Sequence, residues 1–148
     1  MIRKLGHLCL VTDQLEAMRD FYCRQLGMTV KFVFKNKQDQ VFGYYISCGD
    51  STFVEIFDRM GKFNHWGGDK REIMNGSSIN HFCFEIVGME AFRAKLEGRG
   101  VKIRNMKKEM DHSWQMWTSD PDGNSIEFME YTGQSWQLEG GPQLEAAK

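Results

Sequence analysis

Residues 6–31 read GHLCLVTDQLEAMRDFYCRQLGMTVK, and residues 80–103 repeat their pattern as NHFCFEIVGMEAFRAKLEGRGVKI. Each stretch begins with His-x-Cys inside an alternating apolar run, which is typical of a strand. Each continues into a helical pattern that ends at a glycine and is followed by a second β-type run. The two stretches therefore predict two copies of one β-α-β unit.

The predicted helices are defined by apolar stripes and by residues that favour helix ends. In the first copy, Asp13 with Glu16 three positions later predicts a capping box, and Gly27 is placed to terminate the helix. In the second copy, Gly98 and Gly100 end the helix. The stripes consist of Leu15, Met18, Tyr22 and Leu26 in the first copy and of Met89, Phe92 and Leu96 in the second.

Three further β-type segments follow each helix. Two of the connections, CGDS and DPDG, have the composition of tight turns. Each half therefore reads β-α-β-β-β, and the predicted fold class is α+β with two tandem βαβββ modules. The segments are 28–35, 41–49 and 51–57 in the first half, and 101–109, 113–120 and 124–131 in the second.

The length of 148 residues predicts one ordinary domain. We expect this domain to cover residues 1–132, and the tail at 133–148 to be peripheral. Within the domain, module 1 covers about 2–58 and module 2 about 79–132. A linker rich in glycine and charge, at 59–78, joins the two modules.

Composition and charge exclude several classes of function. The formal net charge of −1 argues against a nucleic-acid partner and against an anionic membrane surface. No stretch approaches the roughly 18 apolar residues of a membrane span, and the N-terminus lacks the apolar region of a signal peptide. The four cysteines are far apart and form no CxxC pair, which favours a reduced, cytoplasmic setting.

Two histidines and two glutamates occupy corresponding places in the two copies. His7 and His81 lie on the first strands, and Glu55 and Glu127 lie on the last strands. Because strand side chains alternate, these residues share faces opposite the purely apolar faces that suit a covering helix. If the sheet curls, all four converge, and two imidazoles with two carboxylates make a good site for a divalent metal. Glu130 has the opposite parity to Glu127, and we expect it at the solvent surface.

Other residues near these strands allow two interpretations each. Glu85 could touch a substrate or lie at the rim of the site. Cys9 and Cys83 could join a metal site or pack in a cavity wall. His65 and His112 lie in loop-like contexts and could contact a substrate or lie at the surface. An apolar pocket or ordinary core packing could account for Tyr45, Phe53, Phe57, Trp114, Trp117 and Met129.

Four stretches carry a resemblance to a known family: GHLCLVTDQLEAMRDFYCRQLGM, VEIF, INHFCFEI and WTSDPDGNSIEFME. They resemble the vicinal oxygen chelate superfamily, which includes glyoxalase I, methylmalonyl-CoA epimerase, extradiol dioxygenases and drug-resistance proteins. Within it the chain is most similar to the glyoxalase I-like metalloenzymes. The resemblance covers roughly Ile2 to Tyr131. It implies that the paired modules form a curved eight-stranded sheet around a metal-centred cavity.

The resemblance also implies a site and an activity. By position, His7, Glu55, His81 and Glu127 match the four metal ligands of glyoxalase I. The implied protein is a divalent-metal-dependent isomerase, epimerase or lyase that acts on a small hydroxy-carbonyl compound through a metal-stabilised enediolate. Glu127, with Glu55 as its counterpart, is the implied proton-transferring base. Zinc, nickel, manganese, cobalt or iron could serve as the metal, and a homodimer is implied.

Two departures from the family pattern, together with two other activities of the superfamily, qualify this expectation. Val11 stands where bacterial glutathione-dependent glyoxalases carry an arginine, and Asp58-Arg59-Met60 stands where they carry an asparagine. We therefore expect an activity that does not depend on glutathione. The alternatives are an Fe(II)-dependent extradiol-type dioxygenase and a non-catalytic protein that binds a small molecule such as a drug.

Overall fold

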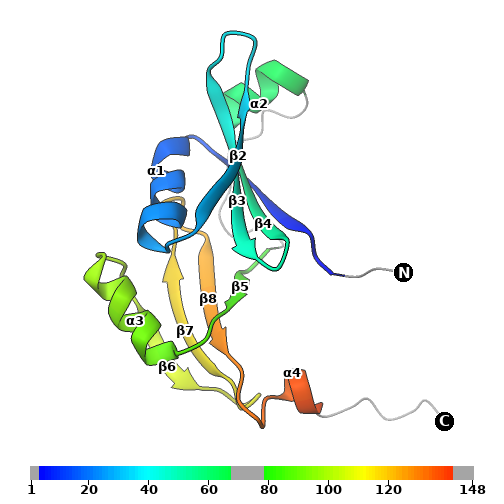
Figure 1. Cartoon of the computed structure of the whole chain (residues 1–148). Coiled ribbons are helices and arrows are strands. Elements are labelled where there is room, and N and C mark those ends of the chain that lie inside the picture. The colour runs from blue at the N-terminus through cyan, green and yellow to red at the C-terminus, as the bar shows by residue number, and fades with distance from the viewer. Residues whose placement is uncertain (1–3, 68–78, 142–148) are drawn as a thin grey trace, which may run out of the picture. The chain divides into compact units, whose positions relative to one another are not determined.

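The computed structural model describes residues 4–67 and 79–141 of the chain. The described residues form two compact units (Figure 1). The first unit comes from the N-terminal half and also includes Asp120–Gly123, and the second comes from the remainder of the C-terminal half. Each unit contains one βαβββ module, so the predicted α+β class with tandem modules is confirmed. None of the described helices is long and apolar enough to cross a membrane.

The first unit is built on a four-stranded sheet with the strand order β1-β4-β3-β2. Strand β1 runs parallel to β4, and the other neighbours are antiparallel. Asp50 and Ser51 both have positive φ, as a tight hairpin between β3 and β4 requires. The elements are β1 (His7–Thr12), α1 (Leu15–Asp20), the π-helical turn η1 (Phe21–Gln25), β2 (Thr29–Lys35), β3 (Val41–Gly49), β4 (Thr52–Asp58) and α2 (Arg59–Trp66).

The predicted first helix forms, but its last turn is wider than expected. Its four stripe residues are all buried, as the spacing predicted. In the final turn, the backbone N–H of Leu26 donates to the carbonyl of Phe21, which is the i→i+5 spacing of a π-helix. Both Phe21 and Tyr22 are buried in this turn. Gly27 follows with a φ of 84°, so the predicted terminating glycine is confirmed.

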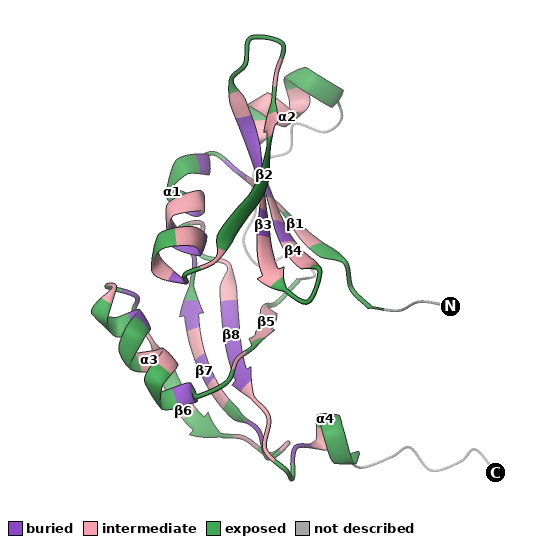
Figure 2. Ribbon diagram, in the orientation of Figure 1, coloured by how far each residue is buried: buried purple, intermediate pink, exposed green. Residues whose placement is uncertain are grey.

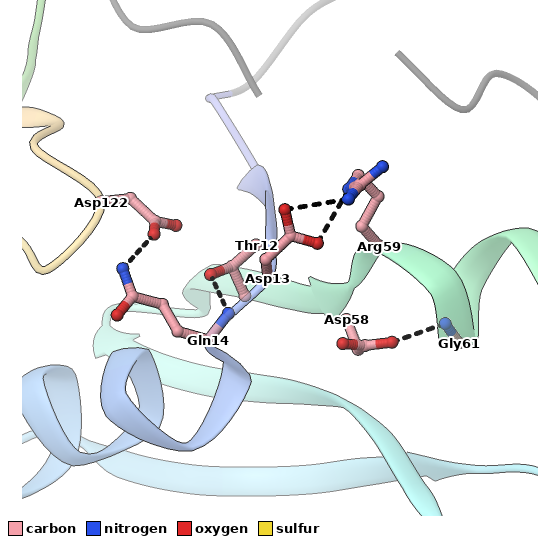
Figure 3. Close-up of polar contacts among 7 residues, drawn as sticks. All are labelled: Thr12, Asp13, Gln14, Asp58, Arg59, Gly61 and Asp122. Carbon is pink, nitrogen blue, oxygen red and sulfur yellow. Dashed lines mark hydrogen bonds and ion pairs between the residues drawn. The ribbon is translucent and has the colours of Figure 1, made fainter. Parts of the chain in front are cut away.

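The predicted capping box at Asp13 and Glu16 is wrong. The residue at the N-cap is Gln14, whose backbone N–H donates to Thr12 Oγ1 at 2.9 Å. Asp13 instead receives two hydrogen bonds from Arg59, at 2.8 and 3.0 Å (Figure 3). The guanidinium fork provides a stronger partner for this carboxylate than a backbone N–H does.

A helix that was not predicted occupies the first part of the expected linker. Asp58 caps this helix, α2, because its Oδ2 accepts from the backbone N–H of Gly61 at 2.6 Å (Figure 3). A Cβ at Gly61 would lie 2.5 Å from the Cβ of Phe42, so only glycine allows this close approach to the sheet. His65 therefore lies in a helix, and its ring stacks on Phe42 at 4.9 Å. Residues 68–78, the rest of the expected linker, lie outside the described part of the chain.

The second unit repeats the arrangement with the strand order β5-β8-β7-β6. Strand β5 runs parallel to β8, and the other neighbours are antiparallel. In each unit, buried residues lie on the inner strands and also on the helices, shown in purple in Figure 2. The elements are β5 (Phe82–Glu85), α3 (Met89–Gly98), β6 (Arg104–Lys108), β7 (Trp114–Ser119), β8 (Ser125–Glu130) and α4 (Trp136–Glu139).

Glu130, expected at the surface, is half-buried and has a structural role. Its carboxylate accepts from the backbone N–H groups of Gly88 at 2.5 Å and Met89 at 2.9 Å. These N–H groups lie at the start of α3, where the helix itself provides no acceptors. Glu130 therefore caps α3 from a neighbouring strand.

The first residues of the C-terminal tail bind the turn between β6 and β7. The backbone N–H of Trp136 donates to the carbonyl of Asp111 at 3.0 Å. The hydroxyl of Ser113 donates to that of Ser135 at 2.8 Å, and both serines are fully buried. These contacts order α4 against the second sheet.

The turn between β7 and β8 belongs to the first unit. The Tyr22 hydroxyl donates to Asp120 Oδ2 at 2.9 Å, and both side chains are buried. The side-chain amide of Gln14 donates to the carbonyl of Pro121 at 3.0 Å and to the Asp122 carboxylate (Figure 3). Module 2 thus supplies a turn that completes the surroundings of the first helix.

Candidate functional site

Glu55 lies in the centre of the first sheet, on the face opposite the helix-covered core. Strand pairing places it beside Cys9 on β1 and Tyr45 on β3. The Glu55 carboxylate lies 3.8 Å from His7 Nε2. The other ring nitrogen of His7, Nδ1, lies 3.3 Å from the Tyr45 hydroxyl. Glu55 is largely buried, whereas the His7 ring is 47% exposed, so the pair is open on the histidine side.

Glu127 occupies the same position in the second sheet. Strand pairing places it beside Cys83 on β5 and Trp117 on β7. Its carboxylate lies 3.2 Å from His81 Nε2, and it is 5% exposed. The Oδ1 atom of Asn80 lies 2.8 Å from His81 Nδ1. The edge of the His81 ring meets Trp117, with ring centroids 4.8 Å apart.

Each module therefore brings together one predicted histidine with one predicted glutamate. His7 pairs with Glu55 in the first unit, and His81 pairs with Glu127 in the second. Within residues 4–67 and 79–141, no group of three or more His, Cys, Asp or Glu is close enough to hold a metal ion. The structure therefore shows one histidine–glutamate pair in each unit.

The two cysteines beside the glutamates are neutral thiols. Burial, followed by the hydrogen bond and the charge of Glu55, raises the pKa of Cys9 to about 12. Burial and the charge of Glu127 raise the pKa of Cys83 to about 12 as well. A neutral S–H donates to a carboxylate and is a poor metal ligand, because metals bind the thiolate. The thiols therefore orient the glutamates.

Burial also raises the pKa of Glu127, although the neighbouring His81 and the Cys83 hydrogen bond act in the opposite direction. A carboxylate removed from water is less stable as an anion, so its affinity for a proton increases. A raised pKa makes a glutamate a stronger base at neutral pH. Glu127 therefore has the electrostatic character that proton transfer requires.

His81 lies between two groups that can only accept hydrogen bonds. Asn80 Oδ1 faces its Nδ1, and the Glu127 carboxylate faces its Nε2. A neutral imidazole carries one N–H, so it can satisfy only one of these acceptors. With the proton on Nδ1, the lone pair of Nε2 points at the carboxylate, and this contact requires a proton or a cation at Nε2. A bound metal ion would supply that positive charge.

The distance within the second pair fits two ligands of one divalent ion. With bonds of about 2.1 Å, two adjacent ligands lie about 3.0 Å apart around an octahedral ion and about 3.4 Å apart around a tetrahedral one. The 3.2 Å between His81 and Glu127 falls between these values. The 3.8 Å between His7 and Glu55 matches neither the about 3.0 Å of adjacent nor the about 4.2 Å of opposite octahedral ligands, so these two side chains would have to move closer together to hold one ion.

The positions that depart from the glutathione-dependent pattern have other roles here. Val11 is half-buried on β1, Asp58 caps α2, and Arg59 binds Asp13. Lys62, which the sequence did not single out, lies in α2, and its charge lowers the pKa of Cys9. The sequence contains no signal for Lys62, because the helix that carries it, α2, has no apolar stripe from which it could be predicted.

The remaining candidates lie outside the two pairs. His65 packs on Phe42, as described above. His112 lies in the turn before β7 with a φ of 63°, and its ring contacts Trp136 at 5.7 Å. Glu85 is exposed at the end of β5, opposite Met129.

Comparison with known proteins relates the chain to one family. Residues 4–128 match the model of the Glyoxalase/Bleomycin resistance protein/Dioxygenase superfamily. A comparison with curated proteins found no match. Among solved structures, a glyoxalase-family protein from Bacillus anthracis is 22% identical with a TM-score of 0.66, covering 89% of this chain and 98% of that one.

Two further solved structures share the fold. A lactoylglutathione lyase from Agrobacterium tumefaciens is 21% identical with a TM-score of 0.61, covering 86% of this chain and 92% of that one. TnmS3, an antibiotic-binding protein from Streptomyces sp. CB03234, is 22% identical with a TM-score of 0.66, covering 88% and 98%. The family match spans most of the chain, and the repeated modules agree with it. The chain therefore belongs to the Glyoxalase/Bleomycin resistance protein/Dioxygenase superfamily.

Proposed function

We propose that the protein is a divalent-metal-dependent isomerase, epimerase or lyase that acts on a small hydroxy-carbonyl compound. The observation that carries this proposal is the position of His81 between two acceptors, Asn80 Oδ1 and the Glu127 carboxylate. Such a histidine is oriented as a metal ligand, with a hydrogen bond holding its outer nitrogen. Membership of the superfamily supports the proposal.

The proposed ligands are His7, Glu55, His81 and Glu127, all bound to one ion. Two glutamates would balance the charge of a divalent cation, and imidazole and carboxylate ligands suit zinc, nickel, manganese, cobalt or iron. When bound, the ion would polarise a carbonyl oxygen of the substrate. The predicted homodimer and cytoplasmic location remain predictions from sequence.

Glu127 is the proposed base, with Glu55 as its counterpart. Glu127 is buried, and its raised pKa favours accepting a proton from the carbon next to a carbonyl. The neutral Cys83 thiol holds one side of its carboxylate, and His81 lies on the other. Glu55 lies at the same sheet position in the first unit and is more exposed to solvent than Glu127.

The proposed activity does not depend on glutathione. The bacterial glutathione-dependent pattern has an arginine where this chain has Val11, and an asparagine where it has Asp58–Arg59. Asp58 caps α2, and Arg59 binds Asp13. These residues leave no free side chain of that pattern to bind a tripeptide carboxylate.

A second candidate is a protein that binds a small molecule without converting it. The likeness to the antibiotic-binding protein TnmS3 favours this candidate, because it has the same fold. The two candidates differ in one measurable property. An isomerase or lyase exchanges a substrate C–H proton with solvent, whereas a binding protein leaves that proton in place.

Metal binding tests the proposed site. The wild-type protein, purified without chelators, should retain one ion per chain by elemental analysis. His7→Ala and His81→Ala should each abolish tight binding, because a single ion held by both pairs needs both. His65→Ala is the matched control and should retain the ion. If His7→Ala left binding at His81 unchanged, the four residues would not share one ion.

Proton exchange tests the proposed base. Deuterium incorporation next to the carbonyl of a panel of hydroxy-carbonyl compounds should be catalysed by the metal-loaded protein. The Glu127→Gln variant keeps an oxygen ligand but loses the base, so it should lose exchange. Wild-type exchange by this variant would refute the assignment. Oxygen consumption during turnover would indicate the dioxygenase instead.

A further inference from the structure

The face of the first sheet that carries Glu55 is lined with aromatic rings. We call this the aromatic face. The rings of Phe32 and Tyr45 are stacked, with centroids 4.5 Å apart and planes at 14°. Phe53 lies 4.7 Å from Tyr45, and Phe34 lies 4.9 Å from Phe57. The aromatic face consists of Phe32, Phe34, Tyr45, Phe53 and Phe57.

The aromatic face continues directly into the His7–Glu55 pair. Pairing across the sheet puts Phe32, Tyr45, Glu55 and Cys9 in one row. His7 meets the edge of the Tyr45 ring at 5.9 Å. The Tyr45 ring is therefore a neighbour of both members of the pair.

Part of the aromatic face is open to solvent. Phe32 is 46% exposed, and the adjoining Trp66 of α2 is 54% exposed. Beneath them, Phe57 lies flat over Gly43, where a Cβ would come within 2.3 Å of its Cδ1. An aromatic ring left in water does not gain the free energy that its burial would provide. A group of exposed rings on a well-packed support is therefore typical of a binding surface.

The second sheet shows that the fold does not require this aromatic row. In the corresponding row, Arg104 pairs with Trp117, and Trp117 pairs with Glu127. Arg104 thus stands where the first sheet has Phe32, and it donates to Thr118 O and Ser119 Oγ. The two modules share the glutamate, the thiol and the neighbouring ring, but only the first has the stacked, exposed phenylalanine.

We propose that the ligand of this site carries a planar aromatic ring next to its oxygen groups, as an aryl-substituted hydroxy-carbonyl compound does. The ring lies on the aromatic face at Phe32 and Tyr45. The oxygen groups lie toward His7 and Glu55. This inference rests on the proposed metal-dependent function and names the substrate class of that same site.

Two related probes isolate the contribution of the ring. Mandelate has a planar ring beside a hydroxyl and a carboxylate, and hexahydromandelate has a saturated ring of similar size with the same oxygen groups. Calorimetric titration of the metal-loaded protein should give mandelate the higher affinity. We expect it to bind about tenfold more tightly than hexahydromandelate, because stacking of aromatic pairs adds to simple burial.

One variant assigns the effect to this face. Phe32→Leu should reduce the preference for mandelate over hexahydromandelate about tenfold. Val33→Ala is the matched control, because Val33 is the next residue of β2 and points to the other face. Its affinities should equal those of the wild type.

The outcomes distinguish this inference from the proposed function. Normal metal binding with no preference for mandelate would overturn the inference and leave the proposed function standing. The wild type could instead retain no metal and still prefer mandelate. That result would overturn the proposed function and support the ligand class. If Phe32→Leu changed only the oligomeric state in light scattering, a second copy would cover the aromatic face, and the inference would be wrong.

Discussion

Replacing Asn80 by alanine removes the acceptor that lies 2.8 Å from His81 Nδ1. Because an amide oxygen only accepts, this contact favours the tautomer with the proton on Nδ1, in which the lone pair of Nε2 faces Glu127. In Asn80→Ala, the ring is free to rotate and to place its proton on either nitrogen. Each of these changes reduces the fraction of His81 that is ready to bind a metal.

The size of the effect follows from the exposure of the pair. Losing a partner that orients a ligating histidine costs about 10- to 100-fold in metal affinity. The His81 side chain is 35% exposed, and Asn80 is exposed, so water replaces part of the lost hydrogen bond. We therefore expect the low end, about tenfold, which corresponds to about 1.4 kcal/mol.

Competition with a chromophoric chelator measures the affinity, and ¹⁵N NMR of the metal-free protein reports which ring nitrogen carries the proton. Asn80→Asp keeps an acceptor and should bind the metal at least as tightly as the wild type. Asn64→Ala, which removes an exposed asparagine from α2, is the matched control. Wild-type affinity in Asn80→Ala would refute the proposed orientation of His81.

Three further predictions concern stability. Glu130→Ala should lower the free energy of unfolding by about 1–2 kcal/mol, because two N–H groups at the start of α3 lose their acceptor; Glu90→Ala, in the first turn of the same helix, should cost less in the same urea titration. Tyr22→Phe should cost about 1.5–3 kcal/mol, because the buried hydroxyl donates to a carboxylate, and an unchanged unfolding midpoint would contradict this. The raised pKa of Glu127 means that the folded metal-free protein binds a proton more tightly than the unfolded chain, so this residue's contribution to stability is lost as pH rises through that pKa. Glu127→Gln should therefore become more stable relative to the wild type as pH rises from the ordinary glutamate pKa to neutrality. If the melting temperatures of the two proteins changed in parallel with pH, the raised pKa would be excluded.

The repeated pattern contained most of the fold. Alternation located the strands, and the three- and four-residue spacing located the first and third helices, because burial on one face imposes these periods. Helix α2 could not be predicted in this way, since none of its residues is fully buried and its first turn contains Gly61. It forms because Asp58 caps it and its rings pack on the aromatic side of the first sheet.

The part of the candidate site that depends on which face of a strand each side chain occupies could be predicted from the sequence. Alternation put each histidine and its glutamate on one face, and the structure brings these pairs together. Glu130 was correctly placed on the opposite face, but its partners at the start of α3 depend on the tertiary path of the chain. The predicted capping box at Asp13 is wrong for the same reason, because Arg59, which binds Asp13, lies in the unpredicted helix α2.

The turn at Asp120–Gly123 has a consequence for cutting the chain in two. A fragment that ended before module 2 would keep Tyr22 buried in its helix but would lack the Asp120 acceptor. Gln14 would also lose the carbonyl of Pro121. Such a half-chain could obtain this turn only from a second molecule. In the full chain both modules are covalently linked, so the turn is present at a high effective concentration that does not depend on the protein concentration.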